Sequence, residues 1–323
     1  MSCNVNILLV GTGSMAIDYH NVLIDLDLSY SVVGRSQKSC EKFFNKTNKK
    51  PIQGGLGKYL SSKPLLPSLA IVSVGVLDLK EATINLIRYG VKNILVEKPG
   101  ALNDFELNEI LEQMNKHQSN VYIGYNRRFY ASTEKAREII DLDGGVTSFN
   151  FEFTEWTTIV EDSNQASEVL ENYFFANSTH VVDLSFYLGG WPKQMESFFS
   201  ESLSWHNRSA IFSGSGISDT NALFSYQANW KSAGRWGLEI LTKKHRLIFR
   251  PFEKLQIQII NDINIKYDTS IDYKYDEKYK PGLFKQVEHF VEQSRSDIYM
   301  QKLCTISQQI HNYRNYYRKI ANY

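Results

Sequence analysis

The pattern of apolar and polar positions along this chain changes between about residues 125 and 145. Before that point, short apolar runs alternate with stretches whose apolar residues recur at helical spacing. The apolar runs predict strands over 4–10, 30–33, 69–74, 93–96 and 121–124, and the other stretches predict helices over 15–26, 39–44, 80–89 and 104–117. Fully apolar strands that alternate with helices predict a parallel sheet covered on both faces.

After about residue 145, several segments alternate between apolar and polar residues at every second position. These segments are 149–156, 222–230 and 236–249. Their period of two predicts strands of a largely antiparallel sheet with one wet face. Helices are predicted over 169–188 and from Gly282 onward. The predicted fold class is therefore α/β, with a doubly wound parallel sheet in residues 1–125 and an α/β domain carrying a large, mostly antiparallel open sheet in residues 126–323.

Length and charge agree with this division. A chain of 323 residues exceeds the size at which one core keeps growing, so two domains are expected. The 36 basic residues nearly cancel the 35 acidic ones, which makes nucleic acid and anionic membranes poor partners. No apolar run approaches the ~18 residues of a membrane span, and the N-terminal sequence lacks the features of a signal peptide.

The three cysteines are Cys3, Cys40 and Cys304, and they are widely separated. Their spacing fits neither a disulfide framework nor a zinc site, so no metal is expected. The simplest location for such a protein is the cytoplasm.

A glycine-containing turn with the sequence GTGSMA lies between the first predicted strand and the first predicted helix. Gly11 permits the tight turn, Gly13 lets a pyrophosphate approach the backbone, and Ala16 allows close packing of helix on strand. The start of the helix offers free N–H groups to an anion. The pattern predicts a Rossmann dinucleotide site containing Gly11, Gly13, Ser14 and Met15. The alternative is that the glycine pair merely forms a turn.

The residues after the second predicted strand bear on the choice of cofactor. An acidic residue that would hold the ribose of NAD is expected here, but the sequence has Arg35 and Ser36, followed by Lys38. A guanidinium, a hydroxyl and an ammonium can all donate to a 2′-phosphate, so NADP is favoured over NAD. The alternative is that Arg35 and Lys38 are solvated charges at the start of a helix.

Glu97 and Lys98 follow the predicted strand 93–96 directly, at the carboxyl edge where open parallel sheets bind ligands. A partly desolvated lysine at this edge could donate to a substrate oxygen or exchange its proton. We therefore place Glu97 and Lys98 at the cofactor and Lys98 also at the reacting centre. On chemistry alone, Lys98 could equally be a surface lysine paired with Glu97.

Five segments together resemble the glucose-fructose oxidoreductase / inositol dehydrogenase / rhizopine catabolism (Gfo/Idh/MocA) family. They are GTGSMA at 11–16, VEKPG at 96–100, GYNRRF at 124–129, HVVDLSFYLGG at 180–190 and YKPGLFKQVEHF at 279–290. The resemblance implies a Rossmann domain followed by an α/β domain whose open sheet often mediates oligomerisation. It also implies hydride transfer between a nicotinamide and a sugar, cyclitol or related carbon, with the substrate bound between the domains.

The resemblance assigns catalytic roles to Lys98 and His180. His180 would act as general base when an alcohol is oxidised or general acid when a ketone is reduced, while Lys98 polarises the same oxygen. Many members carry an aspartate one helical turn before this histidine, and Ala176 occupies that place here. The neighbouring Asn177 could position a hydroxyl but cannot take a proton as a carboxylate can. Asp183 matches a recurrent aspartate of the motif and could brace His180, although a solvated or capping role fits it comparably well.

The segment after the last strand of the first domain carries Asn126, Arg127 and Arg128. Asn126 and Arg127 are expected to touch substrate or nicotinamide. Consecutive residues of an extended stretch point in opposite directions, so Arg128 is expected to form a surface pair instead.

The leading hypothesis is an NAD(P)-dependent oxidoreductase that acts on a hydroxyl or keto carbon of a sugar or nucleotide-sugar, in surface glycan biosynthesis by analogy. Its expected partners are a small sugar-like substrate and further copies of the chain in a homodimer or homotetramer. One alternative is a cofactor-binding regulator without turnover, which the alanine at position 176 favours slightly. Another is a reductase of a non-sugar carbonyl or imine.

Overall fold

The computed structural model describes residues 6–163, 165–296 and 302–323, and Cys3 lies outside them. The chain forms two compact units. Unit 1 comprises Met1–Asn126 and Glu277–Ile310, and unit 2 comprises Arg127–Asp276 and His311–Tyr323. The first boundary adjoins the expected one. The second differs from the expectation, because residues 277–310 pack with the first domain although they were assigned to the second.

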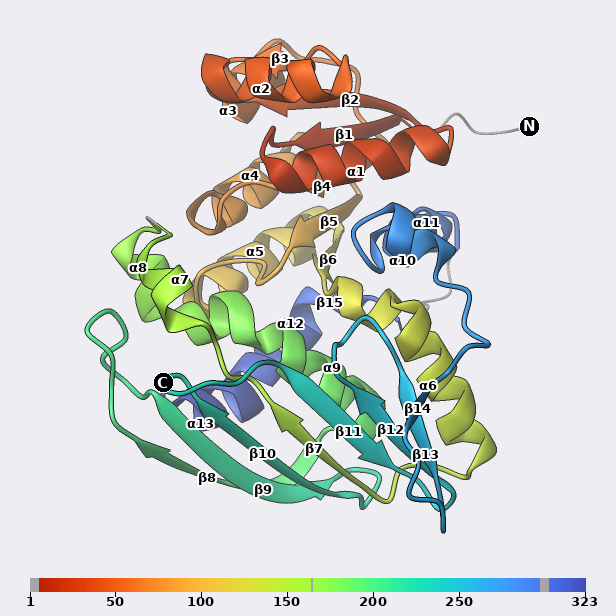
Figure 1. The fold of residues 1–323 in the computed structure, drawn as a ribbon. Coiled ribbons are helices and arrows are strands. Elements are labelled where there is room, and N and C mark those ends of the chain that lie inside the picture. Colours follow the sequence, from red (N-terminus) through yellow and green to blue (C-terminus); the bar gives the residue numbers. More distant parts are fainter. Residues whose placement is uncertain (1–5, 164, 297–301) are drawn as a thin grey trace. The chain divides into compact units, whose positions relative to one another are not determined.

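Unit 1 is built on sheet A, whose described strands have the order β15-β6-β5-β4-β1-β2-β3 (Figure 1). The strands are β1 (Asn6–Val10), β2 (Ser29–Gly34), β3 (Ile52–Gln53), β4 (Leu69–Val72), β5 (Asn93–Glu97), β6 (Asn120–Gly124) and β15 (Cys304–Thr305). The helices that connect successive strands from β1 to β6 are α1 (Ser14–Asp25), α2 (Gln37–Thr47), α3 (Gly55–Ser61), α4 (Val76–Tyr89) and α5 (Asp104–His117). All neighbouring strands between β6 and β3 in this order pair parallel, as the alternating apolar runs predicted.

The C-terminal part of unit 1 returns to the same sheet. β15 pairs antiparallel with β6, with Cys304 opposite Ile123. Helix α11 (Leu283–Gln293) contacts α1, and its Leu283 is fully buried. The sequence pattern predicted only helix here because a strand of two residues leaves no periodic signal. This pairing explains why residues 277–310 belong to unit 1.

Unit 2 is built on sheet B, whose described strands have the order β14-β13-β12-β11-β7-β10-β9-β8. They are β7 (Ser148–Glu152), β8 (Pro192–Ser200), β9 (Ile211–Ser218), β10 (Leu223–Asn229), β11 (Gly237–Leu241), β12 (His245–Phe249), β13 (Gln256–Ile259) and β14 (Lys266–Tyr267). β7 and β10 are parallel, and the other pairs are antiparallel. Strict alternation of buried and exposed residues in β10 confirms that one face of this sheet is wet.

Sheet B differs from the sequence prediction in several details. The stretch 236–249 is a hairpin of β11 and β12, not one strand. β8, β9, β13 and β14 were not predicted. β9 contains Gly214 and Gly216, which weaken a strand pattern. Gly214 has a packing role, because a Cβ there would come within 2.3 Å of the ring of Tyr226.

The helix predicted over 169–188 is interrupted. It consists of α8 (Ser167–Glu171), a π-helical segment (Phe174–Ser178) and α9 (Thr179–Gly189). Every residue of α9 except Tyr187 is buried. Phe186 of α9 packs edge-on against Phe149 and Phe151 of β7, with ring centroids 6.2 and 5.5 Å apart. The helix therefore lies on the inner face of sheet B.

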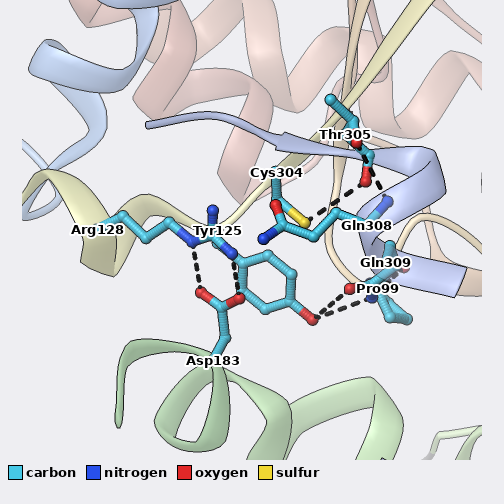
Figure 2. A network of polar contacts seen from close by, with 8 residues as sticks. All are labelled: Pro99, Tyr125, Arg128, Asp183, Cys304, Thr305, Gln308 and Gln309. Carbon is cyan, nitrogen blue, oxygen red and sulfur yellow. Dashed lines mark hydrogen bonds and ion pairs between the residues drawn. The ribbon is translucent and has the colours of Figure 1, made fainter. Parts of the chain in front are cut away.

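A buried ion pair connects α9 to α6 (Ala131–Leu142) through the short helix that precedes α6. Arg128 donates to Asp183 twice, from Nε to Oδ2 at 2.8 Å and from Nη2 to Oδ1 at 2.6 Å, and both side chains are 1% exposed (Figure 2). The prediction of a surface pair for Arg128 was wrong. Residues 126–129 form a 3₁₀ helix, not an extended stretch, and this turns Arg128 inward.

Removal of one partner of the Arg128–Asp183 ion pair should lower the stability of unit 2. Asp183→Ala leaves a buried guanidinium without its counter-charge, and we expect the free energy of unfolding of unit 2 to fall by about 3–5 kcal/mol. Denaturant titration followed by tryptophan fluorescence measures this unit specifically. All five tryptophans lie in it, namely Trp156, Trp191, Trp205, Trp230 and Trp236.

Glu138→Ala serves as the control for Asp183→Ala. Glu138 pairs with Lys135, and its side chain is 64% exposed, so its loss should change stability by less than about 1 kcal/mol. Equal effects of the two substitutions would contradict the importance of the buried pair.

Candidate functional site

Unit 1 contains a cavity of about 550 Å³ at the carboxyl ends of β1, β2 and β4. Of the residues predicted to bind a cofactor, Gly11, Gly13, Arg35 and Ser36 line it. Ser14, Met15, Lys38, Glu97 and Lys98 are not among the described residues of its lining. The cavity lies where open parallel sheets bind ligands.

The two glycines of the turn have different physical roles. Gly11 has φ +119°, and a Cβ there would come within 2.5 Å of the carbonyl oxygen of Ser73. Only glycine fits this position. A Cβ at Gly13 would meet nothing within 4 Å, so this position opens onto free space at the mouth of the cavity. Gly11 thus shapes the turn, and Gly13 leaves room for a ligand.

Helix α1 begins directly after Gly13. Its N-cap has no side chain that could accept from the first N–H groups, and within this fully described helix no acidic residue occupies the first turn. The positive end of a helix of 12 residues is therefore directed to the turn without an acidic side chain from its own first turn. These features fit the phosphate groups of a dinucleotide.

The residues after β2 are arranged partly as predicted. Arg35 lines the cavity and donates from Nη1 to Oδ1 of Asp78 at 2.9 Å, in a pair whose side chains are 78% and 41% exposed. An exposed pair of this kind is weak, so the guanidinium can exchange partners. Ser36 caps α2 by accepting from the N–H of Ser39 at 3.2 Å. Lys38 is exposed on the first turn of α2.

A second glycine-rich segment lines the same cavity, and the sequence reading missed it. Gly54, Gly55, Leu56, Gly57 and Lys58 all belong to the lining. The signal was visible as the sequence GGLGK. It was overlooked because β3, which precedes it, has only two residues.

Glu97 and Lys98 lie at the end of β5, away from the described lining of the cavity. Tyr19 of α1 donates from its hydroxyl to Oε1 of Glu97 at 2.7 Å. Burial raises the pKa of Glu97, and the hydrogen bond from Tyr19 opposes this shift. Glu97 thus connects α1 to β5 and serves the scaffold of unit 1.

The segment that follows Lys98 is held by the C-terminal part of unit 1. Gln309 donates from Nε2 to the carbonyl oxygen of Pro99 and to the hydroxyl of Tyr125, both at 3.0 Å (Figure 2). Asn126, predicted to contact ligand, donates from Nδ2 to the carbonyl oxygen of Pro281 at 2.9 Å. Residues 277–310 therefore fix two of the predicted ligand-binding segments.

In unit 2, the structure brings His180 and Arg127 to one tryptophan. The ring of Trp236 lies 6.2 Å from the ring of His180, and the guanidinium carbons of Arg127 and Arg235 lie 4.7 and 4.1 Å from its centroid. His180 is 8% exposed. The aromatic ring that packs on the predicted catalytic histidine therefore also carries two cations of the same unit.

The other predicted residues of α9 and its π-helical lead have protein partners. Asn177 donates from Nδ2 to Oε1 of Glu155 and to the hydroxyl of Tyr173, both at 3.1 Å. Asp183 uses both carboxylate oxygens for Arg128, so we leave it out of the proposed substrate site. Glu155 was missed by the sequence reading. Its signal was a single acid after the apolar residues of strand β7.

Among the described residues, no group of three or more His, Cys, Asp or Glu side chains could hold a metal ion. Cys40 and Cys304 are buried thiols. No helix of the described ranges is long and apolar enough to cross a membrane.

No protein-family model matches this sequence, and no curated protein matches it. Solved structures do share its fold. A dehydrogenase (MviM) from Clostridium difficile is 16% identical, with a TM-score of 0.77 over 99% of each chain. An oxidoreductase from Agrobacterium radiobacter, solved with NAD⁺, L-tartaric acid and magnesium, is 9% identical, with a TM-score of 0.77 over 99% of this chain and 97% of its own.

A UDP-N-acetylglucosamine 3-dehydrogenase (GnnA) from Acidithiobacillus ferrooxidans is 10% identical, with a TM-score of 0.73 over 98% of this chain and 97% of its own. Identities this low establish the fold alone. The chain has the two-sheet α/β fold of these oxidoreductases, which confirms the predicted fold class.

The two glycines of the turn should respond differently to substitution. Gly11→Ala places a Cβ against a carbonyl oxygen at positive φ, so we expect the unfolding temperature of unit 1 to fall by several degrees. Gly13→Ala adds a methyl group in open space at φ −77° and should leave stability within about 0.5 kcal/mol.

Differential scanning calorimetry measures the stability of both glycine variants. Titration with a dinucleotide measures whether Gly13 takes part in binding. Gly13→Ala should weaken binding at least about tenfold although the fold is unchanged. Tight binding to this variant would contradict the assignment of Gly13 to the phosphate turn.

Proposed function

We propose that this protein is an NADP-dependent oxidoreductase that transfers a hydride between a nicotinamide and a hydroxyl or keto carbon of a sugar or nucleotide-sugar. One observation carries the proposal. An uncapped helix N-terminus and the open position at Gly13 meet at a cavity that Arg35 also lines. Relatives in fold include a UDP-sugar dehydrogenase and an enzyme solved with NAD⁺, which supports this class of reaction.

The proposal assigns the cofactor contacts to the cavity of unit 1. The α1 N-terminus would hold the pyrophosphate, and Arg35 would exchange its exposed pair with Asp78 for a 2′-phosphate. Ser36 lines the same cavity, while Lys38 contributes from the first turn of α2. When bound, the nicotinamide would accept or donate the hydride.

The proton chemistry is assigned to His180 and Lys98. His180 would take the hydroxyl proton during oxidation and return it during reduction, and an imidazole can do both near neutral pH. Lys98 would polarise the reacting oxygen. Arg127, Asn126 and Asn177 are proposed to contact substrate or cofactor.

We also propose that copies of the chain associate through the wet face of sheet B. Leu223 of β10 and Ile217 of β9 are paired across the strands and are 60% and 37% exposed. Phe198 of β8 is 67% exposed. Apolar side chains in this position are suited to a homodimer or homotetramer interface.

Cofactor choice should depend on Arg35. Because a guanidinium can donate to a 2′-phosphate, the wild type should bind NADPH more tightly than NADH, and Arg35→Ala should weaken NADPH about tenfold or more while leaving NADH nearly unchanged. Fluorescence titration of both cofactors measures this. Asp78→Asn, which removes the competing carboxylate, is the matched variant and should tighten NADPH. A wild type that prefers NADH would contradict the NADP assignment.

Catalysis should depend on Lys98 and His180. Each alanine variant is expected to lower the rate of hydride transfer by roughly a hundredfold or more, because each loses a positioned acid–base or polarising group. NADP affinity should survive His180→Ala. The double variant should lose less than the sum of the single losses, because both groups assist one proton transfer.

Single-turnover measurements at the nicotinamide absorbance test the roles of these two residues. Wild-type rates in His180→Ala would overturn the mechanism. Tight NADP binding without transfer to any sugar or nucleotide-sugar would instead favour a regulator that binds the cofactor without turnover.

A further inference from the structure

The strongest unexplained feature of unit 2 is a buried carboxylate next to the turn that carries His180. Glu155 follows β7 and is 2% exposed. Charged side chains are rarely buried to this extent unless they are paired and hydrogen-bonded. The position of Glu155 therefore requires a physical reason.

The partners of Glu155 come from two directions. Oε1 accepts from Oγ of Ser178 at 2.7 Å and from Nδ2 of Asn177 at 3.1 Å, and Oε2 accepts from Nη1 of Arg235 at 3.2 Å. Ser178 and Asn177 are the second and third residues before His180. The carboxylate is thus bonded to the backbone segment on which the histidine is mounted.

A second route leads to the same histidine. Arg235 stacks on Trp236 at 4.1 Å, and Trp236 in turn packs against His180 at 6.2 Å. One carboxylate oxygen therefore holds the chain leading to His180, and the other holds the arginine behind the ring that faces it. Both contacts are within unit 2 and do not depend on how the two units are arranged.

The local backbone explains how two consecutive side chains reach one oxygen. Residues Phe174–Ser178 form a π-helical turn before α9 begins at Thr179. A π-turn is wider than an α-turn and is frequently found at functional sites.

We propose that Glu155 is a positioning residue for His180, holding the turn before the histidine and placing a buried carboxylate beside that turn. This inference rests on the proposed function, because it assigns a role within the same reaction. The carboxylate reaches the helix from the end of a strand instead of from the helix itself. Burial raises the pKa of Glu155, and the hydrogen bond from Ser178 and the charge of Arg235 oppose this shift. When it is ionised, the carboxylate favours the imidazolium that forms when His180 takes a proton.

The charges near Trp236 and the turn before His180 set the sign of the expected effect. Arg127 and Arg235 lie against the ring of Trp236, which packs on His180, and as cations they oppose protonation of the imidazole, whereas an ionised Glu155 favours it. Asp183 lies one turn later but is neutralised by its ion pair with Arg128. Loss of the Glu155 charge should therefore lower the pKa of His180.

The test is a titration of His180 by NMR, with the imidazole signals assigned by comparison with His180→Ala. Glu155→Gln retains the size of the side chain and removes its charge. We expect the pKa of His180 to fall by about half a unit or more. This readout needs neither cofactor nor substrate, so it remains valid even if no sugar is ever turned over.

Glu152→Gln is the matched control. Glu152 lies three residues earlier, on β7 itself, and pairs with Arg250 at 2.9 Å. Glu152→Gln makes the same chemical change on the same segment and should leave the pKa of His180 unchanged. An equal shift in both variants, or no shift in Glu155→Gln, would overturn the proposal.

Ser178→Ala provides a second variant if Glu155→Gln does not fold. Loss of the shortest hydrogen bond to Glu155 raises the pKa of the carboxyl, so the charge near His180 disappears at a higher pH. The pKa of His180 should then fall in the same direction by a smaller amount. An unchanged pKa in Ser178→Ala would count against the proposal.

Kinetics separate positioning from a purely structural role. With a turned-over substrate, Glu155→Gln should lower kcat about tenfold and change KM less than about threefold, and the acidic limb of its pH profile should move with the pKa of His180. A lower rate with an unmoved profile would show that Glu155 is merely structural. Failure of the wild type to transfer hydride would refute the proposed function while leaving the NMR test of Glu155 intact.

Discussion

Helix α9 is buried along nearly its whole length, and this burial imposes a condition on every polar group it carries. A buried polar group without a partner costs free energy comparable to a lost hydrogen bond, and a buried charge costs more. The helix meets the condition locally, since Ser185 donates to the carbonyl oxygen of Val181 and Thr179 donates to that of Phe175. Its charged group needs a partner from elsewhere, and Arg128 provides it.

The same condition accounts for the surroundings of His180. The polar side chains just before it, Asn177 and Ser178, converge on Glu155, whose burial is in turn offset by Arg235. The network holds each member in one geometry because each member depends on the others for its partners. A histidine mounted on such a helix has little freedom, which suits a group that must meet a reacting atom in one orientation.

Unit 1 follows a different rule, in which the backbone shapes the cavity. Its turn works because Gly11 adopts a conformation closed to other residues and Gly13 leaves space. The segment after β5 is held by Gln309, which comes from a remote part of the chain. Sequence patterns predict such turns well, because the required backbone conformation is local and only glycine adopts it easily.

The contrast explains what could be predicted. The strands β1, β2, β4, β5 and β6 were predictable because fully apolar runs are a strong local signal. β15 and the return of residues 277–310 to unit 1 were not, because two residues carry no period and pairing is a long-range property. Arg128 was misplaced since a 3₁₀ turn reverses the direction expected of an extended chain. Glu155 could not be singled out, because one acid after a strand is a weak signal and only the tertiary structure brings it to residues 177 and 178.

The proposed role of Glu155 separates charge from sequence position. A base responds to the field at its ring, and this field depends on distance and burial instead of on which element carries the charge. A strand end packed against a helix can therefore provide what a residue one turn earlier on that helix would provide. The arrangement has a cost, because a buried carboxylate needs a cation, but the 41% exposed side chain of Arg235 remains in contact with water. Charge balance at this site is thus set at the surface of unit 2, while the carboxylate that acts on His180 stays inside.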